Sequence, residues 1–81
     1  MLTNDLKKGA RVKLRNGWMA TVMDNGRGNT RVCEVEGHYT EMGSVYAHDI
    51  VICYPPIGAA VIVEHTEKQL KLREQVEAFG F

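Results

Sequence analysis

The sequence lacks any hydrophobic run long enough to cross a membrane. Its longest apolar run, GAAVIV at residues 58–63, is far shorter than the roughly 20 residues that a membrane-spanning helix needs. The first residues, MLTNDLKKG, also lack the apolar centre of a secretory signal. The sequence therefore predicts a cytoplasmic protein that makes no contact with a membrane.

Cysteine is scarce, because the chain contains only Cys33 and Cys53. In a chain without an export signal, two cysteines are most simply reduced thiols packed as small hydrophobic residues, and a disulfide is the less favoured alternative. The spacings of Cys33 to His38 and of His48 to Cys53 differ from those of zinc fingers and ribbons, whose cysteines come in close pairs. We predict no metal site and no cofactor.

Catalytic motifs are absent as well. Ser44 lacks the flanking glycines of a nucleophile elbow, and no pair of carboxylates stands out. The segment DNGRGN at residues 24–29 lacks the lysine of a phosphate-binding P-loop, and turn geometry accounts for its glycines. We therefore predict that the protein is not an enzyme and has no catalytic residues.

Alternating apolar and basic residues open the chain and predict a β-strand with one face in water. Val12 and Leu14 alternate with Arg11, Lys13 and Arg15, which is the period of a half-buried strand. Gly17 then reverses the chain.

Two registers are open for this first hairpin. A three-residue loop at residues 15–17 turns one set of side chains inward: Trp18, Ala20 and Val22. A two-residue turn at residues 16–17 instead buries the alternate set: Met19, Thr21 and Met23. We prefer the first register because its inward set is larger and more apolar, and we expect Trp18 to be a core residue. Arg11 and Lys13 face outward in both registers.

Turn signals at close intervals divide the following residues into further short strands. The segment at 24–29 predicts a second hairpin, whose return strand TRVCEVE at 30–36 turns Cys33 and Val35 inward. A short strand after Gly37 and His38, a turn at residues 43–44 and a strand at about 49–54 complete the series. About five short antiparallel strands favour a small barrel over an open sheet.

Two segments carry a family resemblance. The sequence KKGARVKLRNGWMATVMDN at residues 7–25 resembles the opening hairpin of SH3-like barrels of the KOW and Tudor-like type, and SVYAHDIV at 44–51 resembles their tight turn and last strand. The likeness covers roughly residues 8–53. It implies an SH3-like antiparallel barrel that contacts RNA, DNA or a protein of the transcription or translation machinery. In size and style the chain also resembles small accessory proteins of phages and other mobile elements.

The remaining residues predict an appendage of one strand and one helix. Pro55 and Pro56 end the barrel, since proline cannot donate a hydrogen bond to a β-ladder, and AAVIVE at 59–64 favours a strand. Thr66 and Gln69 form the pattern of a capping box, which predicts that a helix starts there and ends near Gly80. We thus expect one structural domain, with a barrel at 1–54 and the linker, strand and helix at 55–81 packed on it.

The helix offers a candidate interaction surface. One apolar face of this helix is formed by residues at i, i+4 and i+7: Leu72, Val76 and Phe79. Ion pairs from Glu67 to Lys71 and from Arg73 to Glu77 would decorate its outer face. The apolar face most simply packs on the chain's own barrel. Alternatively, it docks on a partner or on a second copy in a homodimer.

Charge is balanced overall but not along the chain. The formal net charge is zero, yet residues 1–31 hold seven Lys and Arg against two Asp, a charge of +5, and residues 32–81 hold three against eight acidic residues, a charge of −5. Such asymmetry is typical of a surface for a charged partner, although the two halves can also neutralise each other when folded.

The basic hairpin is therefore the leading candidate site. Its members are Lys8, Arg11, Lys13, Arg15, Arg27 and Arg31. We expect a non-enzymatic accessory module that contacts nucleic acid phosphates through this face without sequence choice. The alternative function is a protein–protein interaction module or inhibitor, of phage type, that acts on a host protein. A solvated strand face without a ligand is the simplest explanation of the charges.

Overall fold

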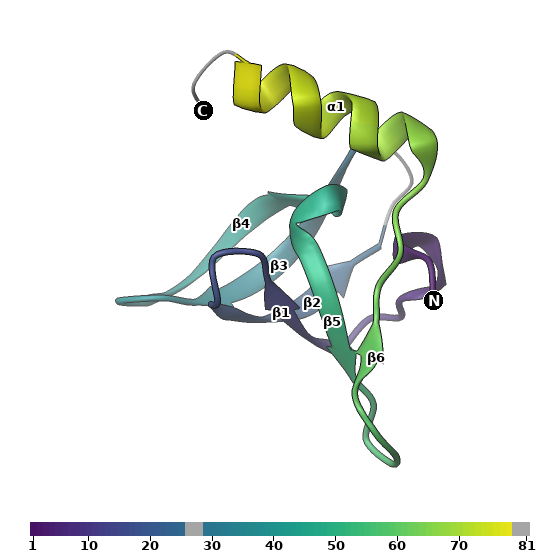
Figure 1. Ribbon diagram of the computed structural model, residues 1–81. Coiled ribbons are helices and arrows are strands. Elements are labelled where there is room, and N and C mark those ends of the chain that lie inside the picture. Colours follow the sequence, from purple (N-terminus) through teal and green to yellow (C-terminus); the bar gives the residue numbers. More distant parts are fainter. Residues whose placement is uncertain (26–28, 79–81) are drawn as a thin grey trace.

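The structure, a computed structural model, describes residues 1–25 and 29–78 (Figure 1). Six antiparallel strands form one sheet in the order β4-β3-β2-β1-β5-β6. The strands are β1 (Arg11–Leu14), β2 (Met19–Asp24), β3 (Thr30–Glu36), β4 (Thr40–Tyr46), β5 (Ile50–Tyr54) and β6 (Val61–Ile62). The helical elements are the 3-10 helices η1 (Thr3–Asp5) and η2 (Ala47–Asp49) and the α-helix α1 (Glu67–Ala78).

The mainly β architecture with one C-terminal helix is confirmed. The strands β1 to β4 form a meander, and β5 returns to pair with β1 on the side away from β2. Within the described residues β4 and β6 each pair with a single strand, so the sheet is not closed.

The first hairpin has the register with a three-residue loop. Val12 lies opposite Ala20, and the Leu14 amide donates to the Trp18 carbonyl at 2.8 Å. Gly17 has a φ of +95°, a conformation that costs glycine little and other residues more. The inward side chains Val12, Ala20 and Val22 are fully buried, as the alternation of the sequence predicts.

Trp18, however, is not a core residue, and the expectation of its burial is wrong. Trp18 is on the same face of the sheet as Ala20 and Val22, but it lies beyond the edge of the core. As a result, 42% of the residue is exposed. The indole lies directly on Gly37, where an added Cβ would come within 2.5 Å of the ring. The ring of His38 meets it edge-on at 5.9 Å between centroids. The indole of Trp18 therefore packs on the backbone of Gly37 instead of on side chains of the core.

The strand β4 also differs from the sequence prediction. The expected turn at residues 43–44 is absent, because all seven residues of β4 pair in register with β3. Gly43 lies opposite Cys33 within this ladder, and its φ is not in the left-handed region. The chain turns later, in η2, after which β5 begins.

The core fills the inner face of the sheet between β1, β2, β3 and β5. Cys33 and Cys53 belong to it, with 0% and 5% exposure, and both are free thiols. Burial raises the pKa of both thiols, which keeps them protonated and poorly nucleophilic. Their expected role as small hydrophobic residues is confirmed. Among the described residues, no helix has both the length and the apolar character to cross a membrane.

The appendage begins as predicted. β6 pairs with β5. The capping box is also present: the Gln69 backbone amide donates to Thr66 Oγ1 at 3.2 Å, and the Thr66 backbone amide donates to Gln69 Oε1 at 2.9 Å. The helix α1 lies across one end of the sheet, next to η2 (Figure 1). Leu72 and Val76 are half-buried, whereas Phe79 and the expected helix end at Gly80 lie outside the described residues.

Candidate functional site

The cations of the predicted basic face do not form one continuous surface. Arg11 and Lys13 lie on the outer face of β1, as expected, because Val12 and Leu14 fill the inner face. The Arg11 guanidinium is held by its own sheet: it forms an ion pair with Glu36 at 2.7 Å and donates a hydrogen bond to Thr21 Oγ1 at 3.0 Å. This cation is therefore largely neutralised.

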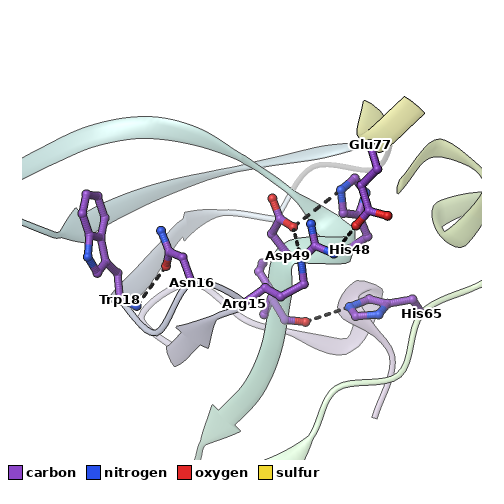
Figure 2. Close-up of polar contacts among 8 residues, drawn as sticks. Arg15, Asn16, Trp18, His48, Asp49, His65 and Glu77 are labelled. Atoms are coloured by element: carbon purple, nitrogen blue, oxygen red, sulfur yellow. Dashed lines mark hydrogen bonds and ion pairs between the residues drawn. The ribbon is translucent and has the colours of Figure 1, made fainter. Parts of the chain in front are cut away.

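Arg15 is also engaged, at the end of the sheet that α1 covers. Figure 2 shows its guanidinium between two carboxylates, Asp49 of η2 at 3.2 Å and Glu77 of α1 at 2.5 Å. The hydrogen bond with Arg15 lowers the pKa of Glu77, and the same bond raises the pKa of Arg15. Glu77 thus pairs across elements to Arg15, rather than with Arg73 along the helix as predicted.

Arg31 is not a surface residue at all, so its assignment to the exposed basic face is wrong. Its exposure is 1%, and its guanidinium donates to Asn25 Oδ1, to Asn4 Oδ1 and, at 2.8 Å, to the Thr30 carbonyl. Burial lowers the pKa of Arg31. Its position is inward because β3 alternates, and Arg31 lies on the same side as Cys33.

The Arg31 network fixes the N-terminal segment to the sheet. The Asn25 side-chain amide donates to three backbone carbonyls of that segment, those of Thr3, Asn4 and Leu6. Arg31 in turn orients the Asn25 amide by donating to its oxygen. A residue that the sequence suggested for ligand contact is instead part of the internal support of residues 3–6.

The remaining cations of residues 1–31 are three lysines and Arg27. Arg27 lies outside the described residues. Within residues 1–25 and 29–78, Lys7, Lys8 and Lys13 form no ion pair. Lys13 is half-buried between Met19 and Ile52 of the neighbouring strands. Lys7 and Lys8 are exposed and adjacent, so they place two unpaired positive charges side by side in the described part of the chain.

These two lysines lie on the rim of an apolar groove of about 580 Å³. The groove runs between the N-terminal segment and the end of β5, and Leu6, Ala10 and Cys53 contribute to it from the core side. Its remaining lining includes Tyr54, Pro55, Pro56, Arg11 and Asp5. A volume of this size falls in the range of pockets that hold ligands.

Local structure explains why both walls are present. On one side, the chain turns at residues 7–10, with the Ala10 amide donating to the Lys7 carbonyl at 3.0 Å and Gly9 at a φ of +90°. Both lysines are exposed in this turn. On the other side, Pro55 and Pro56 stop β5 directly after Tyr54 and leave rigid apolar rings at the surface.

The groove combines an apolar lining with two ammonium groups. Its apolar lining can take up a hydrophobic side chain, and the ammonium groups of Lys7 and Lys8 can bind carboxylates at the rim. The Asp5 carboxylate, which accepts a hydrogen bond from the Leu2 backbone amide at 3.1 Å, also lines the groove, so the two lysines outnumber it and the charge at the rim is positive. No group of three or more His, Cys, Asp or Glu that could hold a metal ion occurs in residues 1–25 and 29–78.

A second cluster lies under α1 and is structural in character. His48 is 1% exposed and its ring stacks on Tyr46 at 5.0 Å, while His65 Nε2 hydrogen-bonds to the Ile50 carbonyl at 2.7 Å (Figure 2). Burial lowers the pKa of His48, against the smaller opposing effect of Asp49. These residues tie η2, β5 and the segment before α1 together, and the hollow beside Asp49 is small, at about 150 Å³.

Sequence reasoning named Lys8 and Arg11 but missed the groove that they border. Its two walls are more than 40 residues apart in the sequence, and they meet only because β5 pairs with β1. From the sequence alone, Pro55 and Pro56 are assigned only the role of ending a strand. The available signal was an exposed Lys-Lys-Gly turn before one strand and a Tyr-Pro-Pro sequence after a strand expected to pair with it.

Comparisons with protein-family models, with curated protein sequences and with solved structures give no match to this chain. The interpretation of the groove therefore depends on its own residues and geometry.

Proposed function

We propose that the protein is a non-enzymatic interaction module that binds a short acidic and hydrophobic segment of a partner protein in the groove between residues 5–11 and 53–56. The observation that carries this proposal is the combination of an apolar groove of about 580 Å³ with Lys7 and Lys8 on its rim. An apolar side chain would fill the groove, and carboxylates beside it would bind the two ammonium groups.

The dispersal of the other cations supports a protein partner over nucleic acid. A phosphate-binding face needs several free cations along one surface, but Arg11 and Arg15 are paired with carboxylates and Arg31 is buried. Two adjacent lysines beside an apolar groove suit a ligand with both charge and hydrophobic side chains better than they suit a polyanion. These residues therefore favour the alternative function inferred from the sequence, protein–protein interaction, over phosphate binding.

At the level of fold, we propose that residues 1–54 are an open variant of the SH3-like barrel that the sequence resembles. The strand order and the 3-10 turn between β4 and β5 support this proposal. In such an arrangement β5 returns to β1, and this return is what forms the second wall of the groove.

A peptide-display selection on the immobilised protein tests the binding proposal. We expect the enriched peptides to combine Asp or Glu with large apolar residues. The affinity of one enriched, fluorescein-labelled peptide would then be measured by anisotropy. The double variant K7E/K8E should weaken this binding at least tenfold, because two attractive charges become repulsive.

The matched control is K68E/K71E on α1, which makes the same charge change in exposed residues at the other end of the molecule. It should leave the peptide affinity unchanged within about twofold. Equal losses in the two double variants, or enrichment of peptides without acidic residues, would contradict the groove as the binding site.

A second experiment distinguishes binding of a partner protein from binding of nucleic acid phosphates. Single- and double-stranded DNA and RNA oligonucleotides would be titrated at two salt concentrations. Binding that is tighter than that of the selected peptide, and that falls linearly in log affinity against log salt, would restore the phosphate hypothesis and overturn this proposal.

A further inference from the structure

The two edges of the sheet are very different. β6 has two residues, whereas β4 has seven and pairs with β3 without a bulge. Proteins usually protect an exposed edge with lysine, proline, a bulge or a very short strand. β6 is short, but β4 carries none of these features, and Glu41 is its single charged residue.

The hydrogen bonds at both ends of the β3–β4 ladder show which backbone groups of β4 are free. The Ala47 amide donates to the Asn29 carbonyl at 2.9 Å, and the Gly37 amide donates to the Tyr39 carbonyl at 3.2 Å. In an antiparallel ladder, bonded and non-bonded pairs alternate, so the odd-numbered residues of β4 bond to β3. The amides and carbonyls that point away from the sheet belong to Thr40, Met42, Ser44 and Tyr46.

We propose that β4 pairs antiparallel with β4 of a second copy of this chain, around a twofold axis at Gly43. In this register Met42 lies opposite Ser44 of the second copy, and Thr40 lies opposite Tyr46. All four residues with outward-pointing backbone groups then exchange hydrogen bonds, and the two sheets become one continuous sheet.

A second copy of the chain suits this edge because the hydrogen-bonding groups of β4 are self-complementary. The four free residues lie symmetrically on either side of Gly43, so a single twofold axis satisfies them all. Glu41 falls opposite Val45 and meets no like charge. The formal net charge of the chain is zero, so two copies do not repel each other at long range. Pairing also covers Met42 and Tyr46, which are 58% and 39% exposed.

This interface is independent of the groove. The groove is formed by the N-terminal segment, β1 and the end of β5, and β2 and β3 separate β1 from β4 in the sheet. A dimer through β4 therefore leaves both grooves open. A single-edge interface is smaller than the roughly 1,600 Å² of tight complexes, so we expect a weak dimer, with a dissociation constant on the order of 10–100 µM.

Sedimentation equilibrium over a range of concentrations tests the pairing. The wild-type mass should rise from 9.1 kDa toward twice that value. Ser44→Pro removes an outward amide that β3 does not use, so it should keep the chain monomeric, whereas the control Ser44→Thr should dimerise like the wild type. A wild type that stays at monomer mass at about 1 mM, well above the expected dissociation constant, would overturn the proposal, as would dimers of the proline variant equal to those of the threonine variant.

A cysteine at the axis tests the register, and it decides the matter if the proline variant fails to fold. Gly43 pairs with itself as a non-hydrogen-bonded pair, with Cα atoms about 4.5 Å apart, a separation that suits a disulfide. An added Cβ at Gly43 meets no atom within 4 Å. Because Cys33 lies opposite Gly43 in the same chain, the variant is made as G43C in a C33A background.

Under mild oxidation, G43C should form a disulfide-linked dimer on a non-reducing gel. The matched control E41C, in the same background, places the two thiols four residues out of register, about 13 Å apart along the strand, and should link at least tenfold more slowly. Equal rates of linkage for the two variants would exclude the proposed register, and absence of linkage in G43C would exclude the interface.

Discussion

The two ends of the sheet use charge in opposite ways. At the end covered by α1, Arg15 is held between Asp49 and Glu77, so a cation of the basic half neutralises carboxylates of the acidic half (Figure 2). At the other end, Lys7 and Lys8 have no carboxylate partner in residues 1–25 and 29–78. The same charge asymmetry along the sequence therefore serves internal pairing at one end and leaves a positive groove at the other.

Different interactions stabilise the two ends of the sheet. Exposed ion pairs such as those of Arg15 are screened by water and contribute little to stability. The N-terminal wall of the groove is instead fixed by the buried network of Arg31 and Asn25, and losing a partner of a buried charged group costs several times more. Substitutions should therefore destabilise the fold most in this buried network and least at the exposed lysines of the groove rim.

The largest effect is expected at Arg31. Arg31→Ala leaves the oxygens of Asn25 and Asn4 without their donor and opens a cavity, so it should reduce the free energy of unfolding by about 3 kcal/mol. For a chain of this length, that loss lowers the Tm by roughly 10–20 °C. Thermal unfolding followed by circular dichroism measures it, with the exposed substitution Lys8→Ala as the control. A shift as small as that of the control would mean that the network does not support the groove wall.

The burial of Arg31 also shows how far sequence reasoning reached in the fold. The alternation of Val12 with Leu14, the turn at Gly17 and the Thr66 capping box are local signals, and each predicted its element correctly. The alternation of β3 placed Cys33 inward, and the same parity places Arg31 inward. Sequence reasoning nevertheless assigns a charged side chain to the surface, because the side chains that help to offset its desolvation, Asn25 and Asn4, are not apparent in a linear reading.

The candidate site was less predictable than the fold. Which cations remain unpaired depends on contacts across the chain, such as Arg11 with Glu36 and Arg15 with Glu77, and no local pattern encodes these. Trp18 shows the same limit: its register was predicted correctly, but its exposure depends on where the core ends. Local periodicity fixes which side a residue faces, whereas tertiary pairing decides whether that side is covered.

Acidic pH should destabilise the end of the sheet that α1 covers. Burial lowers the pKa of His48 in the folded protein, so as the pH falls below about 6.5 the unfolded chain takes up a proton before the folded chain does. Stability should therefore be constant between about pH 7 and 8 and fall below about 6.5, by at most about 1.4 kcal/mol per pH unit.

Urea unfolding at pH 7.5, 6.0 and 5.0 measures this loss. The groups that face His48 include Tyr46, Asp49, Arg15 and Arg73, and His48→Gln removes the titrating ring while these neighbours remain. The variant should be less stable at neutral pH but should lose less stability between pH 7.5 and 6.0. A slope that is unchanged in the variant would assign the acid sensitivity to another group.

A smaller effect is expected when Arg15 is replaced. Arg15→Ala should reduce the free energy of unfolding by at most about 1 kcal/mol, because its two ion pairs are exposed and screened by salt. The loss should shrink when the experiment is repeated in 0.5 M NaCl, where the Debye length is only about 4 Å. Lys71→Ala, which lies on α1 without an ion pair among the described residues, is the control. A loss as large as that of Arg31→Ala would mean that α1 is held mainly through this contact.

The smallest effect on stability is expected where the effect on binding is expected to be largest. K7A/K8A removes two exposed side chains that make no ion pair with the described residues, so the free energy of unfolding should change by no more than about 0.5 kcal/mol. The same variant should still weaken the selected acidic peptide severalfold, because attraction at the rim is lost. Parallel measurement of Tm and peptide affinity checks both outcomes. If the double substitution destabilised the fold as much as Arg15→Ala, the lysines would be structural, and the contrast between a neutralised end and a binding end would fail.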